Sequence, residues 1–583
     1  MSTFTIEGDQ FVRDGEPLRL LSGEIHYFRV PRPYWADRLR KARACNLNAV
    51  CTYVAWNWHE PQPGQFCFSG NLDVAAFVRE AAAADLMVLV RPGPYICSEW
   101  DLGGLPWWLL RDPEMRLRCN YPPYLEAVDR FLDALMEQLV PLQCTHGGPI
   151  IAMQVENEYG SYGNDQAYLR HLADGLRRRG VDVLLYTSDG PTDFMLQGGT
   201  LPEIHKIANF GSGARAAFAK LREYQPTGPL MCGEFWNGWF DHWGEEHHRR
   251  DPADAAAALE EILALGGSVN LYMFHGGTSF GFAPGANHPG TYQPDVTSYD
   301  SDAPLDEAGD PTPKFHAFRE LLGRYAPPSG LPVPEPAPKQ ALGCVALTEA
   351  VSLWEALPAL STPVRRPTPV TMEALGQGYG FILYRTRVSG PRPAGPLQIR
   401  DVHDRAQVFL DGRFVGVLER DGAVNTLEIT IPDGGAQLDI LVENQGRVNY
   451  GPELHDRKGI TASVTLSNQL LFDWQIYPLP LADLSVLRFV PVGQATLPDG
   501  PRFYRGTFDA PTQADTFLAV PGGKKGFCFL NGINLGRYWE KGPQRTLYVP
   551  GCWLRPQGNE LVVFELHELD QPEAHLVDRP SLG

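Results

Sequence analysis

Short apolar runs alternate with amphipathic, helix-like segments along residues 1–320 of the chain. The runs are continuously apolar, a pattern that indicates parallel strands buried on both faces of a sheet. Helical spacing follows most of them, as in residues 124–140 and 253–267. Strands are predicted within residues 18–28, 48–56, 87–93, 148–160, 181–190, 205–211, 229–236 and 268–277. Eight strand–helix units predict a closed (β/α)8 barrel.

A proline-rich segment separates this pattern from a different one. Residues 327–338 hold six prolines in twelve positions, which is typical of a stiff linker. Beyond it, short alternating runs are separated by Gly, Asp, Asn and Pro, as in all-β domains. We therefore predict four parts: a barrel over residues 1–326, a linker over 327–340, a first β-sandwich over 341–480 and a second β-sandwich over 481–583.

The β-rich half contains an internal repeat. Tyr384-Arg385 recurs as Tyr504-Arg505, FLDG at 409–412 recurs as FLNG at 529–532, and Gly416 recurs as Gly536, each after 120 residues. Asp-Gly and Asn-Gly between apolar strands are strong signals for a tight hairpin. Three matches at one spacing predict two related sandwiches.

Composition narrows the class of protein. Of 583 residues, 43% are hydrophobic and 20% are charged, as in ordinary globular domains. A net charge of −19 disfavours nucleic acid as a partner. The ten cysteines form no C-x-x-C pair and are expected to be reduced. No signal peptide and no membrane-spanning run are visible, so we expect a cytoplasmic protein. The sequence does not fix the assembly, and a homodimer is one expectation.

Acidic residues stand at the ends of two predicted barrel strands. Glu156 and Glu158 close the fourth strand, and Glu234 closes the seventh. Active sites of such barrels lie at the carboxyl ends of the strands. A pair of carboxylates there is what glycoside hydrolysis requires, one to protonate the leaving oxygen and one to attack the anomeric carbon or activate water.

Glu156 and Glu158 would point to the same side if their segment stays extended. We favour Glu158 as the catalytic acid because it lies nearer the barrel mouth. It also follows Asn157, whose amide can hold a sugar hydroxyl. Glu156 is expected to be a structural ion-pair partner.

Several long motifs make the chain recognisable. They are QVENEYGSYG (154–163), RPGPYICSEWDLGGLPWWLL (91–110), GEFWNGWFDHWG (233–244), NLYMFHGGTSFGF (270–282), TSYDSDAPLDEAGD (297–310) and TYVAWNWHEPQPGQF (52–66), with GRVNYG (446–451) in the β-rich half. Together they resemble family 35 of the glycoside hydrolases, the β-galactosidases, in the order of that family's motifs.

The resemblance implies an exo-acting, retaining mechanism on a galactosyl oligosaccharide, without a cofactor. By motif position, Glu158 is the proton donor and later the general base, and Glu234 is the nucleophile. Galactose contacts carry over onto Tyr53, Ile96, Cys97, Ser98, Glu99 and Asn157. The family usually has a tyrosine where this chain has Ser301, which puts one contact in doubt. Tyr299 is expected to compensate, or a water molecule fills the space.

Aromatic residues suit the leaving sugar. Trp236 and Trp239 flank the nucleophile and, with Tyr450 from the β-rich half, are expected to form a platform for it. The alternative is that these aromatic side chains only pack at the barrel rim and do not contact substrate. The tryptophans favour β-1,3-linked galactose on N-acetylhexosamine.

Other chemistries remain as alternatives. No histidine spacing matches a metal site, so no catalytic metal is expected. Two rival functions stay open. One is another retaining barrel glycosidase, of the β-glucosidase or mannanase type, and the other is a non-catalytic carbohydrate-binding protein.

Overall fold

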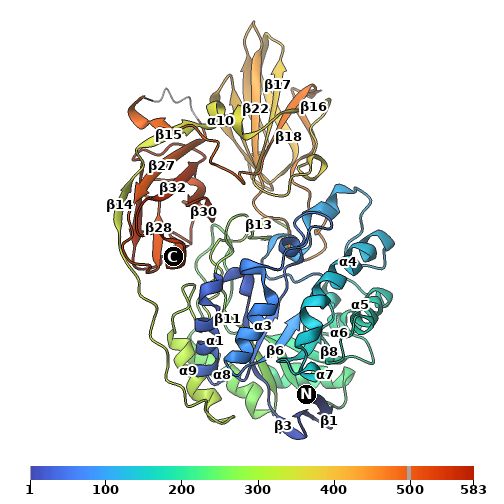
Figure 1. Cartoon of the computed structure of the whole chain (residues 1–583). Helices are drawn as coiled ribbons and strands as arrows, with labels where there is room; N and C mark the ends of the chain where they lie inside the picture. The colour runs from blue at the N-terminus through green and yellow to red at the C-terminus, as the bar shows by residue number, and fades with distance from the viewer. Residues whose placement is uncertain (1, 495–499) are drawn as a thin grey trace.

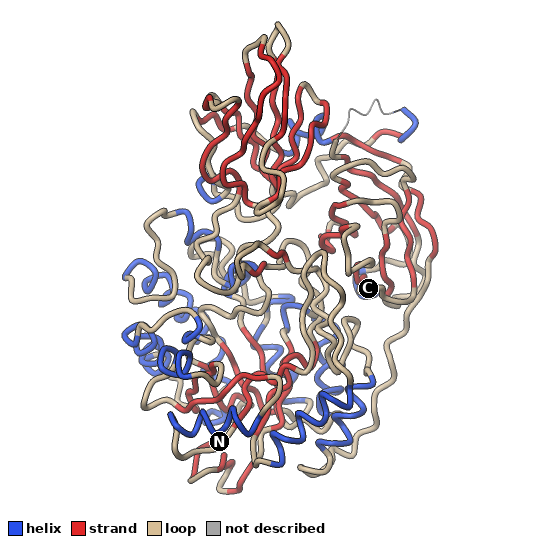
Figure 2. Tube along the Cα trace, turned by 180° about the vertical axis from the view of Figure 1, so that it is seen from behind, coloured by secondary structure: helices blue, strands red, loops and turns tan. Residues whose placement is uncertain are grey.

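A computed structural model of the chain describes residues 2–494 and 500–583. It has three parts (Figure 1): a barrel wrapped by helices forms the lower half, and two β-rich domains lie side by side above it. The view from behind shows the same division, with helices concentrated around the barrel (Figure 2). Among the described helices, none has the length and apolar character needed to cross a membrane.

Eight parallel strands close into the predicted barrel, in the order β10-β11-β4-β5-β6-β7-β8-β9. Their residues are almost all buried, since the barrel interior packs one face and the helices pack the other. The strands are β4 (Leu21–Ile25), β5 (Ala49–Tyr53), β6 (Met87–Arg91), β7 (Ile150–Gln154), β8 (Leu184–Asp189), β9 (His205–Phe210), β10 (Met231–Trp236) and β11 (Ser268–His275). All eight predicted strand positions are confirmed.

The helices of the barrel follow the predicted amphipathic segments. They are α1 (Trp35–Ala44), α2 (Trp56–His59), α3 (Val74–Ala83), α4 (Pro122–Leu139), α5 (Gln166–Arg178), α6 (Asp193–Gly199), α7 (Ala214–Tyr224), α8 (Pro252–Ala264) and α9 (Pro313–Leu322). In α4 the buried side chains recur along one stripe that faces the barrel. The short helices α2 and α6 were not predicted. Neither was a small antiparallel sheet of β1 (Phe4–Glu7), β2 (Gln10–Arg13) and β3 (Glu16–Leu18).

The first β domain consists of two sheets. One has the order β16-β25-β17-β22-β19-β20, and the other has the order β21-β18-β23-β24. Their strands are β16 (Val364–Arg366), β17 (Phe381–Val388), β18 (Arg392–His403), β19 (Arg405–Leu410), β20 (Arg413–Glu419), β21 (Leu427–Ile431), β22 (Ala436–Glu443), β23 (Gly459–Leu466), β24 (Gln469–Leu470) and β25 (Trp474–Leu479).

The second β domain repeats this plan, with sheets β26-β15-β27-β32-β29-β30 and β14-β33-β28-β31. Its strands are β14 (Gly343–Ala346), β15 (Glu349–Ser352), β26 (Val490–Pro491), β27 (Arg502–Phe508), β28 (Thr516–Ala519), β29 (Lys525–Leu530), β30 (Ile533–Trp539), β31 (Leu547–Val549), β32 (Asn559–Glu565) and β33 (Glu573–Val577), and helix α10 (Leu353–Leu360) follows β15.

The sequence repeat corresponds to a structural one. Tyr384 lies on β17 and Tyr504 on β27, which occupy the same place in their sheets. The FLDG and FLNG segments form the β19–β20 and β29–β30 hairpins. Both turns have left-handed backbone, with φ of 48° and 78° at residues 411–412 and 51° and 84° at residues 531–532, as a type I′ turn requires.

The structure corrects one predicted domain boundary. Strands β14 and β15, which we assigned to the first sandwich over 341–480, pair with β33 and β27 of the second. The second sandwich is therefore built from two separate segments, because its sheets need strands from both before and after the first sandwich. Figure 1 shows the chain leaving α9 as a long extended connection that rises along the molecule to β14.

A hydrophobic cluster joins the two β domains. Leu383, Leu441 and Tyr477 of the first domain pack with Phe527 and Phe564 of the second. The part of the outward face of the β17 sheet that carries Leu383, Leu441 and Tyr477 is thereby buried.

One loop of the first β domain reaches the barrel mouth. Arg447 donates hydrogen bonds to Asp101 of the barrel and to Glu373 of its own domain, and all three side chains are buried. Gly446 has φ of 117°, and a Cβ there would lie 2.4 Å from the carbonyl oxygen of Pro284, so only glycine fits. This loop places Tyr450 over the barrel.

Candidate active site

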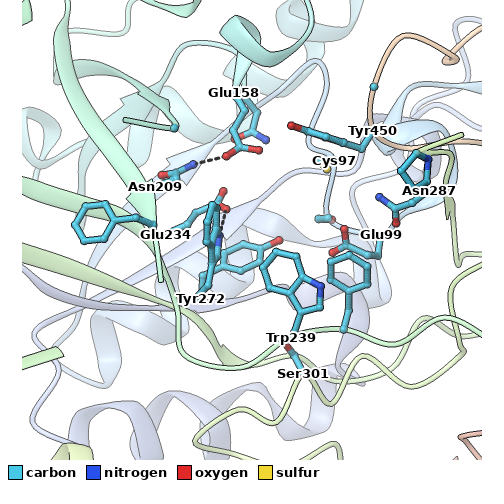
Figure 3. A pocket seen from close by; sticks show the side chains of 18 of the residues that line it. Cys97, Glu99, Glu158, Asn209, Glu234, Trp239, Tyr272, Asn287, Ser301 and Tyr450 are labelled. Carbon is cyan, nitrogen blue, oxygen red and sulfur yellow. Dashed lines mark hydrogen bonds between the residues drawn. The ribbon is translucent and has the colours of Figure 1, made fainter. Parts of the chain in front are cut away.

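A cavity of about 690 Å³ opens at the carboxyl end of the barrel strands. Glu158 and Glu234 both line it, and Figure 3 shows their carboxylates directed into the same space. Its further lining includes residues that we predicted to contact substrate: Tyr53, Cys97, Ser98, Glu99, Asn157, Trp236, Trp239, Tyr299 and Tyr450. The cavity therefore brings together residues from seven barrel strands or the loops that follow them and from the first β domain.

Glu234 is held as a hydrogen-bond acceptor on both carboxylate oxygens. Arg91 pairs with its Oε1, and the Tyr53 hydroxyl lies 3.0 Å from the same oxygen. The indole Nε1 of Trp236 donates to Oε2 at 3.2 Å. These donors fix the orientation of the carboxylate. Held in this way and directed into the cavity, Glu234 is placed as a nucleophile would be.

Arg91 is itself fixed by a buried network. Its guanidinium donates to Gln154 and Asn157 at 2.7 Å each and lies 3.4 Å from Glu24. Burial alone would raise the pKa of Glu24, but the charge of Arg91 and the hydrogen bond with His26 lower this pKa to about 2. The arginine therefore balances two carboxylates inside the barrel.

The environment of Glu158 favours the protonated form of its carboxyl group. Burial, and then the negative charge of Glu234, raise the pKa of Glu158 to about 8. Asn209 Nδ2 donates a hydrogen bond to its Oε1 at 2.9 Å. Glu158 is thus driven to hold a proton beside a second carboxyl group, which is the arrangement expected of a catalytic acid in a glycosidase.

The segment after β7 is not extended, contrary to our assumption. Strand β7 ends at Gln154, and Glu156 and Glu158 have φ of 58° and 45°. Glu156 turns away from the cavity and forms an ion pair with Arg118, with an N–O distance of 2.8 Å. The prediction that Glu156 is a structural ion-pair partner is confirmed, whereas the expectation that Glu156 and Glu158 point to the same side is wrong.

Glu99 forms a second acidic wall of the cavity. The Tyr299 hydroxyl donates to its Oε2, and the Arg29 guanidinium lies 3.8 Å from the centre of the Tyr299 ring. Burial raises the pKa of Glu99, and the charge of Glu234 adds to this effect. Residues 97–99 have φ between 50° and 56°, so three successive side chains depend on a strained turn for their position.

Not every predicted contact lies in the cavity. Ile96 is fully buried, packs near Gly104 and is absent from the cavity lining. It follows a sharp turn after β6 that directs its side chain into the core. Ser301, the position where the family usually has a tyrosine, lines the cavity wall (Figure 3). The difference from the family therefore falls inside the site, and the hydroxyl of Tyr299 is already bonded to Glu99.

The aromatic side chains line the outer part of the cavity. Trp236 and Trp239 meet edge to face, with ring centres 5.7 Å apart at 85°. Trp239 and Tyr450 are 41% and 38% exposed, so their surfaces are available to a ligand. Figure 3 shows both directed toward the space beyond the two glutamates. These rings do not form one flat platform; they line different sides of the outer cavity.

Sequence reasoning missed several residues that shape the site. Arg91, Asn209 and Tyr272 come from barrel strands, and Asn287 and Gln293 come from the long loop after β11. Arg91 lies inside the motif that carried the resemblance, and its position at the end of β6 was a usable signal. Nothing in the pattern of the loop indicated that it would fold over the barrel mouth.

Possible metal ligands gather in one place among the described residues, away from the cavity. Cys344, Glu573 and His575 lie on paired strands β14 and β33 of the second β domain. None of the three lines the catalytic cavity. The cavity itself is lined by three glutamates, Glu99, Glu158 and Glu234, with amide and guanidinium donors beside them. This chemistry suits acid–base and nucleophilic catalysis.

Comparisons with known proteins agree with this geometry. The family described as "Glycosyl hydrolases family 35" matches residues 10–325. The descriptions "Beta-galactosidase, first all-beta domain" and "Beta-galactosidase, galactose-binding domain" match residues 369–480 and 501–559.

Curated relatives match over nearly the whole chain. A β-galactosidase of Xanthomonas manihotis is 50% identical over 94% of this chain and 91% of its own. Relatives of the same name from Bos taurus and Homo sapiens are each 45% identical, covering 97% and 99% of this chain and 90% of their own.

Proposed function

The chain belongs to family 35 of the glycosyl hydrolases and is a β-galactosidase, and from this premise we propose that it releases terminal, non-reducing β-D-galactose from oligosaccharides with retention of configuration. The observation that carries the proposal is the contrast between the two cavity glutamates. Arg91, Tyr53 and Trp236 hold Glu234 for attack, whereas burial and the charge of Glu234 keep Glu158 protonated.

In the first step, a Glu234 carboxylate oxygen attacks the anomeric carbon of galactose. The bond from that carbon to the leaving oxygen breaks, and Glu158 transfers its proton to this oxygen. With a pKa of about 8, Glu158 holds that proton at neutral pH. The products of the step are the free aglycone and a galactosyl ester of Glu234.

In the second step, water attacks the same carbon and the ester bond breaks. The Glu234 charge is absent from the ester, so the pKa of Glu158 falls and its carboxylate can accept the proton of water. Galactose leaves with its original β-configuration, and both glutamates return to their starting states.

Removal of single terminal sugars follows from what bounds the cavity. The loop with Tyr450 and the loop with Asn287, His288 and Gln293 line its outer part. These walls leave room for a terminal galactose and part of the aglycone. We propose that they prevent a polysaccharide chain from crossing the site, which makes the enzyme exo-acting.

Linkage preference is a further part of the proposal. The aromatic faces of Trp239 and Tyr450 suit an N-acetylhexosamine joined through a β-1,3 bond. Rates on β-1,3, β-1,4 and β-1,6 galactosyl disaccharides test this preference. Nitrophenyl galactoside, glucoside and mannoside compared side by side test the galactose specificity against the β-glucosidase and mannanase alternatives.

Azide rescue tests the two catalytic roles separately. With an activated aryl galactoside, Glu158→Ala supplied with azide is expected to yield β-galactosyl azide, because Glu234 still forms the covalent intermediate. Glu234→Ala is expected to yield the α-azide by direct attack. The same anomer from both variants would contradict the assignment, and unchanged hydrolysis by Glu234→Gln would contradict the nucleophile.

We also propose a cytoplasmic location, which is supported by ten cysteines that are all free. To test the location, cells are extracted in the presence of an alkylating reagent, and the reduced protein is separated from any disulfide-linked form. A cytoplasmic protein is expected to be found in the reduced form. A homodimer stays a prediction, and sedimentation of the full chain tests it.

A further inference from the structure

A second concave surface lies on the first β domain, outside the catalytic cavity. Its volume is about 820 Å³, and four arginines line it, namely Arg365, Arg366, Arg385 and Arg387. We call this surface the arginine groove. It lies on the outward face of the sheet that contains β16, β25 and β17, which Figure 1 shows at the end of the molecule away from the barrel. Elsewhere on that face, Leu383, Leu441 and Tyr477 pack against the second β domain.

The strand register places the guanidinium groups in a grid. Arg365 of β16 is opposite Gln475 of β25, and Gln475 is opposite Arg385 of β17. Neighbouring strands lie about 4.8 Å apart, so the backbones at Arg365 and Arg385 are about 10 Å apart. Arg387 is two residues along β17 and projects from the same face. The grid is too wide for one small anion to span.

Most of this positive charge lacks an acidic partner. Arg385 pairs with Asp439, at 2.6 Å from its Nε. Arg387 donates to the carbonyl oxygen of Gly434, and Arg366 donates to that of Arg365. Among the described residues, no ion pair within 4 Å involves Arg365, Arg366 or Arg387. Asp473 also lines the groove, so the four arginines exceed its acidic side chains, Asp439 and Asp473, by two charges. In a chain of net charge −19, this local excess of positive charge favours an anionic ligand at the groove.

The groove also offers the contacts that a sugar ring needs. Phe472 lines the groove, and its side chain is 53% exposed. Gln475 contributes an amide group between Arg365 and Arg385, and Gln437 contributes another beside Arg387 on β22. An aromatic face beside amides and guanidinium groups can hold both the apolar side of a pyranose and its acidic substituents. A lipid headgroup would use the charges but not this combination.

We propose that the arginine groove binds an acidic oligosaccharide, with sulfate or carboxylate groups on successive sugar residues. The site is separate from the proposed catalytic cavity and anchors an anionic glycan to the enzyme. Guanidinium groups hold its charges by paired hydrogen bonds, and Phe472 packs against one ring.

Calorimetric titration of the full chain with a sulfated galactan oligosaccharide, and with the same oligosaccharide after desulfation, tests the proposal. We expect saturable binding of the sulfated form, at least tenfold weaker binding of the desulfated form, and at least a tenfold loss of affinity in the variant R365Q/R366Q/R387Q. The matched control is R40Q/R178Q/R215Q, which removes three exposed arginines elsewhere on the barrel helices. It changes net charge equally and is expected to bind like the original chain.

Hydrolysis of nitrophenyl galactoside is measured on both variants and is expected to be unchanged, so failure of groove binding is distinguished from failure of the catalytic proposal. An equal loss in the control variant would show that net charge alone attracts the ligand. Equal binding of the desulfated oligosaccharide would also overturn the proposal. So would absence of saturable binding, or binding to phosphatidylserine vesicles that the sulfated oligosaccharide does not displace.

Discussion

Asn209 donates a 2.9 Å hydrogen bond to Glu158 from β9, the strand next to the one that carries Glu234. In the register of the two strands, Asn209 lies beside Glu234. The Asn209 amide thus joins the strand that neighbours Glu234 to Glu158, and its donor opposes the rise in the pKa of Glu158 that burial and Glu234 cause.

The substitution Asn209→Ala is expected to shift the alkaline limb of kcat/KM upward. Loss of the donor destabilises ionised Glu158, so its pKa rises above about 8. A hydrogen bond to a charged group is worth about 1.5–3 kcal/mol, which corresponds to a shift of about one pH unit or more. A pH profile with an aryl galactoside measures it. Asn164→Ala, at an exposed position outside the cavity, serves as the control. A downward shift would contradict the role of Asn209.

Glu158→Gln is expected to increase thermal stability more at pH 9 than at pH 5. The folded protein raises the pKa of Glu158 from 4.5 to about 8, so the native state holds a proton that the unfolded state releases. The penalty for burying its charge is absent below pH 4.5 and grows as pH rises toward 8. Glutamine carries no such charge at any pH.

Unfolding temperatures of both proteins at pH 5, 7 and 9 measure this difference. Glu114→Gln, at an exposed position, is the control and is expected to give a constant difference. If the advantage of Glu158→Gln does not grow with pH, Glu158 is not held protonated by the fold.

The sequence predicted the barrel well because its signal is local. Each barrel strand is a continuous apolar run such as residues 87–91, and burial on both faces requires that pattern. The repeat at 120 residues was also visible, since Asp411-Gly412 and Asn531-Gly532 need the same unusual backbone.

The sequence was insufficient where distant segments meet. The pairing of β15 with β27 joins Glu349 to Arg505, across a whole intervening domain. Likewise, the direction of Glu156 depended on a left-handed turn and on Arg118, which approaches from another loop. A local sequence pattern does not show which distant segment a strand or side chain will contact. The sequence therefore identified these side chains but did not predict the direction in which they point.

Arg91→Met is expected to destabilise the protein by about 3–5 kcal/mol, because it leaves the buried acids Glu24 and Glu234 without their shared cation. Activity on galactosides should fall at least a hundredfold as Glu234 loses its orientation. Denaturant unfolding of Arg91→Met, Glu234→Gln and the double variant gives the coupling free energy between Arg91 and Glu234. The double variant should be less destabilised than the sum of the two single variants. Simple additivity would contradict the ion pair.

Trp239→Ala is expected to raise KM for a β-1,3 galactosyl disaccharide about five- to tenfold, since a half-buried aromatic face contributes about 1–1.5 kcal/mol to ligand contact. Trp239 suits this test better than Trp236, because the indole of Trp236 also donates to Glu234, the proposed nucleophile. KM for β-galactosyl fluoride, which has no second sugar, should stay nearly constant. Phe66→Ala, an exposed aromatic outside the cavity, is the matched control. Equal changes for both substrates would mean that Trp239 supports the fold of the site and does not contact the leaving sugar.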